Sequence, residues 1–210
     1  MPGLPSEELS SFLIWVFDDQ LGRVKKSEFP YKIITKHGHG NFHPVRECHL
    51  PSTFNGEAYY TIANYGSEIK LHLNSNRSLS SYHGPVFHPY ILTDLDRGKS
   101  SLNTLKKTLV EYVEFLEYEK EIPSSWIKMF FSGSKGFHLE IPSKIFGIKP
   151  EYKLETKIRE LVDLLTADLS IRQYVDWHVY TPHRMIRLSN SIHPKSQKFK
   201  IPITIGDLRK

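Results

Sequence analysis

Three long stretches of the chain repeat hydrophobic residues at the spacing of an amphipathic helix. The pattern predicts helices over residues 6–21, 101–117 and 151–169, each with a single apolar stripe. Such a stripe packs one side of a helix against a core and leaves the opposite side polar. These three segments are therefore expected to supply the helical layer of a folded domain.

Short runs rich in β-branched and aromatic residues lie between the predicted helices. Six runs are typical of β-strands, at residues 58–65, 68–73, 90–96, 127–131, 137–141 and 198–205. Helices and strands interleaved in this way indicate an α/β or α+β domain. Because no Pro/Gly/Ser-rich break divides the chain, we expect one domain over residues 1–210.

The composition narrows the class of protein. The chain is 39% hydrophobic and 24% charged, which is typical of a soluble globular domain. Its longest nearly apolar run near the start, Phe12 to Phe17, is far too short to span a bilayer, so we expect no membrane segment. The single cysteine, Cys48, excludes an internal disulfide and suits a reducing compartment. A net charge of +5 favours an anionic partner such as a nucleotide or nucleic acid.

The predicted strand "YILTDLD" ends in two carboxylates. Side chains alternate between the faces of a strand, so Asp94 and Asp96 project to the same side, one pleat apart. Two carboxylates at that separation repel each other unless a cation lies between them. The pair therefore indicates either a Mg²⁺ or Mn²⁺ site or a strand that simply runs into an Asp-rich turn.

The run "MFFSGSKGFHLEI" predicts a β-hairpin with a turn at residues 132–136. Beyond the turn, alternation places His138 on the face opposite its apolar neighbours. Backbone N–H groups of a glycine loop that also carries Ser and Lys can cradle phosphate oxygens. The loop lacks the Walker A spacing, and an ordinary hairpin with an exposed histidine is the alternative interpretation.

The run "VDWHVYTPHRMIRLSNSIHPKS" places a third carboxylate, Asp176, ahead of a dense polar and basic segment. Arginine offers a planar fork to phosphate oxygens, and lysine adds a point charge. A solvated basic surface is the alternative. Three aspartates, a glycine loop and this segment together contain what phosphoryl transfer from a nucleoside triphosphate requires.

At these residues the sequence resembles the archaeo-eukaryotic primase superfamily, which includes the catalytic small subunit of primases and the primase-polymerases. The superfamily carries an hhDhD strand, an S-G-x-[KR]-G-x-H loop and a later hydrophobic-Asp, here "ILTDLD", "SGSKGFH" and "YVD" in the same order. Its nucleotide-binding signature H-R-x-x-R-x-x-x-S-x-H-x-K-[ST] is matched by "HRMIRLSNSIHPKS". The resemblance extends from about residue 84 to 204 and is weak before that.

The resemblance implies an α+β, two-lobed core, with a mixed β-sheet lobe and its helices packed against an RRM-like lobe. It implies template-directed nucleotidyl transfer from NTPs or dNTPs to a 3′-hydroxyl, with two Mg²⁺ or Mn²⁺ ions held by Asp94, Asp96 and Asp176. The remaining site residues that it implies would bind the nucleotide: Ser132, Gly133, Ser134, Lys135, Gly136, His138, Arg184, Arg187, Ser191, His193 and Lys195.

The implied partners are an NTP or dNTP, a single-stranded DNA template, and a helicase, large primase subunit or other replication or repair protein. The implied location is the cytoplasm of a prokaryote or mobile element, or a eukaryotic nucleus. Primer synthesis is the leading interpretation; the alternatives are gap-filling repair synthesis and a catalytically silent nucleotide- or nucleic-acid-binding module.

Family primases usually carry a cysteine-rich zinc motif, which one cysteine cannot build. The group His37, His39, His43, Cys48 and His49 fits no common zinc template, so we expect no zinc site. The chain is thus expected to be a stripped catalytic core with neither a zinc ribbon nor a helicase domain.

Overall fold

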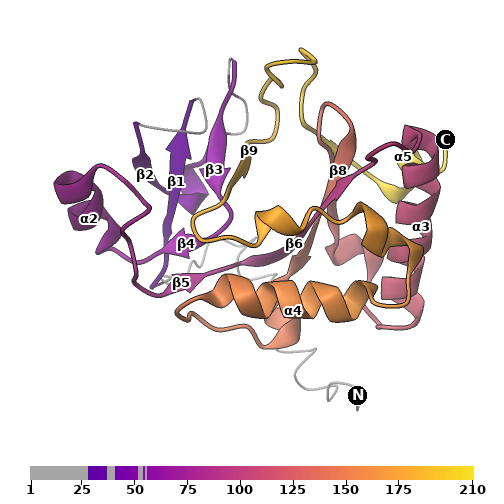
Figure 1. Cartoon of the computed structure of the whole chain (residues 1–210), viewed down its shortest axis with the longest axis horizontal. Helices are drawn as coiled ribbons and strands as arrows, with labels where there is room; N and C mark the ends of the chain where they lie inside the picture. The colour runs from indigo at the N-terminus through magenta and orange to yellow at the C-terminus, as the bar shows by residue number, and fades with distance from the viewer. Residues whose placement is uncertain (1–27, 37–40, 52–53, 55) are drawn as a thin grey trace.

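The computed structural model describes residues 28–36, 41–51, 54 and 56–210. The helix expected over 6–21, and His37 and His39 of the histidine group, lie outside the described residues. The described chain is α+β, with two β-sheets and helices at their flanks (Figure 1). Among these residues, no helix combines the length and apolar character needed to cross a membrane.

The first sheet has six strands in the order β5-β4-β1-β3-β9, and β2 pairs with β1 beside this path. Its members are β1 (Tyr31–Thr35), β2 (His43–Arg46), β3 (Tyr59–Thr61), β4 (Asn64–Tyr65), β5 (Val86–Phe87) and β9 (Met185–Arg187). The predicted run 58–65 is split into β3 and β4 by a bend. Strand β9 comes from the polar segment far along the chain and pairs with β3, with Tyr59 opposite Arg187.

The second sheet has four strands in the order β10-β7-β8-β6. Its members are β6 (Tyr90–Asp96), β7 (Lys128–Phe131), β8 (Gly136–Pro142) and β10 (Ile201–Ile203). All four were predicted, and β7 and β8 form the expected hairpin around residues 132–135. Every strand pairing described in the two sheets is antiparallel, so the expected mixed sheet is wrong.

Two of the predicted helices are confirmed as α3 (Leu102–Tyr118) and α4 (Leu154–Thr166). The Ser101 side chain caps the first by accepting a hydrogen bond from the Thr104 N–H, which satisfies one of its free backbone donors. The short helix α5 (Ile205–Leu208) follows β10. Single turns of 3₁₀ helix connect the rest: η1 (Glu47–His49), η2 (Ser124–Trp126), η3 (Ser143–Phe146), η4 (Ser170–Tyr174) and η5 (Trp177–Val179).

The run at 68–73 is a helix, α2 (Ile69–Asn76), and the strand predicted there is wrong. Ile69, Leu71 and Leu73 alternate in sequence, which suits a strand. Residues four apart also share one side of a helix, so Ile69 and Leu73 are buried together while Leu71 is 73% exposed. A run of six residues does not distinguish the two periods.

One hydrophobic core joins α3, α4 and strands of both sheets. In Figure 1, α3 lies beside the four-stranded sheet and α4 runs across the bottom of the view. The alternate β8 residues Phe137, Leu139 and Ile141 are buried in this core, as the apolar period predicted. The intervening residues of β8, His138 and Glu140, are therefore directed to the other face of the sheet.

Candidate functional site

The structure brings the backbones of the three aspartates together at the end of β6. Asp94 and Asp96 share one face of the strand, as alternation predicted. The segment between η4 and η5 runs alongside, because Leu95 forms a β-bridge with Val175 and the Asp176 N–H donates to the Asp94 carbonyl at 2.8 Å. Asp176 is therefore a neighbour of Asp94 although the two are 82 positions apart in the sequence.

Burial, together with the negative charges of Asp176 and Asp96, raises the pKa of Asp94 to about 7. Lys200 and Arg184 act in the opposite direction. The Asp94 carboxylate is thus crowded by like charge, a situation that a bound cation relieves. This donor chemistry, two carboxylates near a third that is largely buried, fits Mg²⁺ or Mn²⁺.

The carboxylates are nevertheless not arranged as a ligand set. Asp96 forms an ion pair with Lys135 and accepts from the Gly98 N–H at 3.0 Å. Asp176 caps η5 by accepting from the His178 N–H at 3.0 Å. Across the described residues, no three His, Cys, Asp or Glu side chains lie close enough to hold one metal ion. Binding a cation would require the three carboxylates to move closer together, and Asp96 to share or release its ion pair with Lys135.

The hairpin loop depends on its two glycines. Gly133 has φ +80°, and a Cβ there would lie 2.8 Å from the Phe199 carbonyl oxygen. A Cβ on Gly136 would lie only 1.9 Å from the Leu95 carbonyl oxygen on β6. Within the loop, the Ser132 hydroxyl accepts from the Gly136 N–H at 3.2 Å. The glycines therefore permit close packing of the loop against β6 and against residues 198–199.

His138 on β8 lies directly opposite Asp94 on β6. It is 5% exposed, so the alternative of an ordinary hairpin with an exposed histidine is wrong. Its Nε2 is 3.5 Å from Asp94 Oδ1, while its Nδ1 is buried and has no hydrogen-bond partner in the described part of the chain. Burial, followed by the charges of Lys200 and Arg187, lowers the pKa of His138 well below its usual value, so the imidazole is neutral at neutral pH.

Arg187, at the end of β9, is half-buried, and its Nη1 atom is buried with no hydrogen-bond partner among the residues that the structure describes. Burial lowers the pKa of its guanidinium, opposed by Tyr59, Glu57 and Asp94. Unpaired buried donors are rare in folded proteins because they lose their hydrogen bonds to water. Arg187 thus provides an unpaired buried donor, and His138 provides an unpaired buried ring nitrogen whose donor or acceptor role depends on the tautomer. The Arg187 charge acts on His138 beside the aspartates.

The rest of the predicted nucleotide-binding signature divides into exposed and structural residues. Arg184 and Lys195 are exposed, as is Lys135 on the hairpin, while Ser134 is half-buried. Ser191 is fully buried and donates to the Leu188 carbonyl at 2.7 Å. His193 Nδ1 accepts from the N–H groups of Lys195 and Ser196, both at 3.1 Å.

The loop that follows β9, residues 188–200, is called the signature loop here because it carries most of the predicted signature. A hydrogen bond connects it to the hairpin loop at residues 132–135. The Ser196 hydroxyl donates to the Gly133 carbonyl. Figure 1 shows both loops at the top of the view, above β9 and β8. The loop following β9 therefore lies against the hairpin of the other sheet, and the two predicted phosphate-binding segments are neighbours.

One residue near the aspartates was missed by the sequence analysis. Lys200 is fully buried, and its Nζ donates to the Arg187 carbonyl at 3.0 Å. Burial lowers its pKa to about 8, opposed by Glu140 and Asp94, so it stays largely protonated at neutral pH. In the sequence, Lys200 is one residue of a predicted strand and precedes Ile201 and Pro202. Nothing in that local pattern indicates that its side chain is buried.

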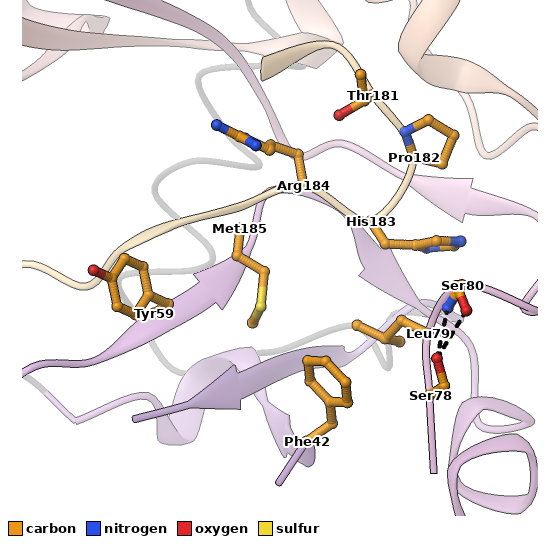
Figure 2. A pocket seen from close by; sticks show the side chains of 10 residues that line it. All are labelled: Phe42, Tyr59, Ser78, Leu79, Ser80, Thr181, Pro182, His183, Arg184 and Met185. Atoms are coloured by element: carbon orange, nitrogen blue, oxygen red, sulfur yellow. Dashed lines mark hydrogen bonds between the residues drawn. The ribbon is translucent and has the colours of Figure 1, made fainter. Parts of the chain in front are cut away.

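An open pocket of about 560 Å³ lies next to β9 and shares only Arg184 with the predicted site (Figure 2). Phe42, Leu79 and Met185 supply its apolar lining. Figure 2 shows the Arg184 side chain pointing away from Phe42 and Met185. None of the three aspartates lines this pocket, so the predicted metal site and the pocket are two separate places that share Arg184 at their border.

No family model and no curated protein matches this chain. Among solved structures, it is similar to the "Polymerase Domain from Mycobacterium tuberculosis Ligase D in complex with DNA". The similarity has a TM-score of 0.47 at 12% identity and covers 88% of this chain and 76% of that chain. At that score and identity, the likeness assigns neither residues nor an activity to this chain.

Proposed function

We propose that this chain is a nucleotidyltransferase of the primase-polymerase type, which extends or initiates a strand on single-stranded DNA. The proposal rests on one observation: a carboxylate on β6 lies next to buried nitrogen atoms that have no hydrogen-bond partner among the described residues. A crowded carboxylate, Asp94, lies opposite His138. The buried nitrogens of His138 and Arg187 that have no hydrogen-bond partner among the described residues lie beside it. A metal-bound triphosphate would satisfy both groups, since it brings cations for the carboxylates and oxygens for the donors.

In the proposed reaction, the 3′-hydroxyl oxygen of one nucleotide bonds to the α-phosphorus of an NTP or dNTP. The bond between that phosphorus and the bridging oxygen breaks, pyrophosphate leaves with the electron pair, and the hydroxyl proton passes to solvent. Asp94, Asp96 and Asp176 would hold two divalent ions, which when bound lower the pKa of the hydroxyl and neutralise the phosphate charge.

The chain's other residues bind and orient the triphosphate. Arg187 would donate from its buried Nη1 to a phosphate oxygen, where a charge-assisted bond is short and directional. His138, in the tautomer that carries its proton on Nδ1, would donate from that nitrogen. The exposed Lys135, Arg184 and Lys195 would add positive charge around them. Ser134 and the backbone of Gly133 and Gly136 would line the same hairpin. Ser132, Ser191 and His193 would act by holding the shape of the two loops.

The continuous core supports the further proposal that residues 1–210 act as one catalytic domain. Initiation without a primer and extension of a primer use the same three aspartates in this scheme. The choice between a primase and a gap-filling repair polymerase is therefore an outcome of the experiment below.

The test is nucleotide incorporation on single-stranded DNA, with and without a primer, in Mn²⁺ or Mg²⁺ and a mixture of ribo- and deoxyribonucleotides. Wild-type protein should make product, and Asp94→Asn should reduce it to background because a neutral amide is a poor ligand for a hard cation. Asp168→Asn, which removes the same charge at an exposed position, is the control and should be fully active.

Product without a primer would identify a primase, and product only with a primer would identify a gap-filling polymerase. Strong residual synthesis by Asp94→Asn would overturn the assignment of the aspartates. A wild-type protein that binds nucleotide but makes no product under any of these conditions would instead identify a silent binding module.

A further inference from the structure

The two halves of the proposed site belong to different sheets. Asp94 and His138 lie on the four-stranded sheet, whereas Arg187 ends β9 of the six-stranded sheet. Strands β9 and β6 each stand at the end of their sheet's strand order, and Figure 1 shows both in the middle of the molecule. Some contact must fix β9 relative to β6, because phosphate-binding groups act only when held within a fraction of an ångström of their position.

Lys200 makes contacts with both sheets at this point. Its ammonium donates to the Arg187 carbonyl at 3.0 Å, which is the end of β9. The same ammonium lies 4.7 Å from the ring centroid of Phe130 on β7 of the other sheet. It also lies 5.9 Å from the ring of Tyr60 on β3, the neighbour of β9. With no exposed surface, Lys200 is enclosed between these groups.

The charge of Lys200 acts on the residues proposed to do the chemistry. It lowers the pKa of Asp94 and the pKa of His138, and it is itself influenced by Arg187 and Glu140. A buried ammonium costs free energy unless it is compensated by hydrogen bonds and opposite charge. Here Asp94 and Glu140 provide that opposite charge, so the lysine and the catalytic carboxylate are electrostatically coupled.

We propose that Lys200 is a positioning residue for the proposed nucleotidyl transfer, which holds the end of β9, and with it Arg187, in place and supplies a fixed positive charge close to Asp94. The proposal rests on the proposed function. Lys200 lies beyond the 183–196 signature, and it acts through the backbone of Arg187 and through its charge, without being a metal ligand.

This role predicts that loss of the Lys200 charge weakens the binding of one ligand and not of the other. The Lys200 charge repels a cation bound by Asp94 and attracts the anionic triphosphate. Lys200→Met keeps the aliphatic stem and removes the charge and the hydrogen bond. Mn²⁺ alone should therefore bind Lys200→Met as well as wild type or more tightly, whereas nucleotide in Mn²⁺ should bind more weakly. A residue that only supports the fold would weaken both or neither.

The experiment is calorimetric titration of the full chain, first with MnCl₂ and then with dGTP in saturating Mn²⁺. Lys200→Met should lower dGTP affinity by about tenfold, the scale of one charge-assisted hydrogen bond. Lys198→Met is the matched control, because it removes the same charge from an exposed position two residues away and should leave both affinities unchanged.

A double substitution tests the link to Arg187. If Lys200 acts by holding Arg187, the protein with both Lys200→Met and Arg187→Met should bind dGTP no more weakly than Arg187→Met alone, apart from a small purely electrostatic loss. Fully additive losses would overturn the positioning role. So would a parallel loss of Mn²⁺ and dGTP affinity in Lys200→Met.

Thermal melting first establishes that each variant is folded. Should Lys200→Met not fold, Lys200→Arg carries the test, because it keeps the charge and a donor and should bind dGTP within about threefold of wild type. A folded Lys200→Arg protein with the tenfold defect would count against the proposal. Absence of Mn²⁺-dependent dGTP binding in wild type would defeat the proposed function itself, whereas wild-type binding by Lys200→Met would defeat only this inference.

Discussion

The two faces of the four-stranded sheet differ although they are made by the same strands. On one face, Ile91, Leu95 and Leu139 are fully buried in the hydrophobic core. On the other, Asp94 lies opposite His138, and Glu140 is buried 3.5 Å from the Tyr60 hydroxyl. One face is thus held by apolar contacts, and the other concentrates buried ionisable groups whose electrostatic cost the first must offset.

This difference indicates a division of labour between alternate residues. Apolar burial on the core face stabilises the sheet, and burial of carboxylates on the polar face destabilises it. Polar groups that weaken a fold are typical of sites that bind charged ligands. Removing a buried apolar group from the core face and removing a carboxylate charge from the polar face should therefore change stability in opposite directions.

The largest stability effect is expected on the core face. Leu139→Ala should destabilise the protein by about 2–5 kcal/mol, because it removes fully buried methyl groups and leaves a cavity. The measurement is the free energy of unfolding in urea. Leu71→Ala, at a leucine that is 73% exposed on α2, is the control and should change stability by less than about 0.5 kcal/mol. Equal losses for the two would contradict the comparison.

On the polar face, Asp94→Asn should stabilise the protein at alkaline pH. The folded-state pKa of Asp94, about 7, lies above its ordinary value of 3.8. The protonated carboxyl therefore contributes stability that is fully present below pH 3.8 and is lost as pH rises through 7. Asparagine never ionises, so the gain should appear above that range and vanish below it.

The expected gain at about pH 8 is roughly 1–3 kcal/mol, less than the full pKa difference implies because the side chain is 23% exposed to water. Urea unfolding at about pH 8 and about pH 4 measures it, without added metal. A gain of the same size at both pH values would mean that the charge of Asp94 is not its cause.

The smallest effect is expected at the exposed end of the polar face. Lys128 Nζ donates to the Tyr90 hydroxyl at 2.6 Å, and it also lies 4.2 Å from the ring centroid. Tyr90→Phe removes the hydrogen bond and keeps the ring, so it should cost about 0.5–1 kcal/mol in unfolding free energy. If Tyr90→Phe lowered the unfolding free energy as much as Leu139→Ala, the polar face would contribute as much to stability as the core face does.

The sequence predicted how the candidate site residues of β6 and β8 are directed, because the direction of a strand side chain depends only on its position within the strand. Alternation within β6 and β8 placed the two aspartates on one face and His138 opposite the apolar residues, and pairing of the two strands then set Asp94 against His138. The hairpin turn was equally readable from its glycines. The helix α2 was not, because six residues satisfied the strand and helix periods equally well.

The sequence by itself determined which residues alternate, where the chain turns and which side chains could bind metal or phosphate, since these follow from covalent geometry and residue type. The tertiary structure alone decided that β9 crosses to β3, that Asp176 lies beside Asp94, and that Lys200 is enclosed between two sheets. Burial and charge at a residue depend on what distant segments pack around it, and no local period encodes those neighbours.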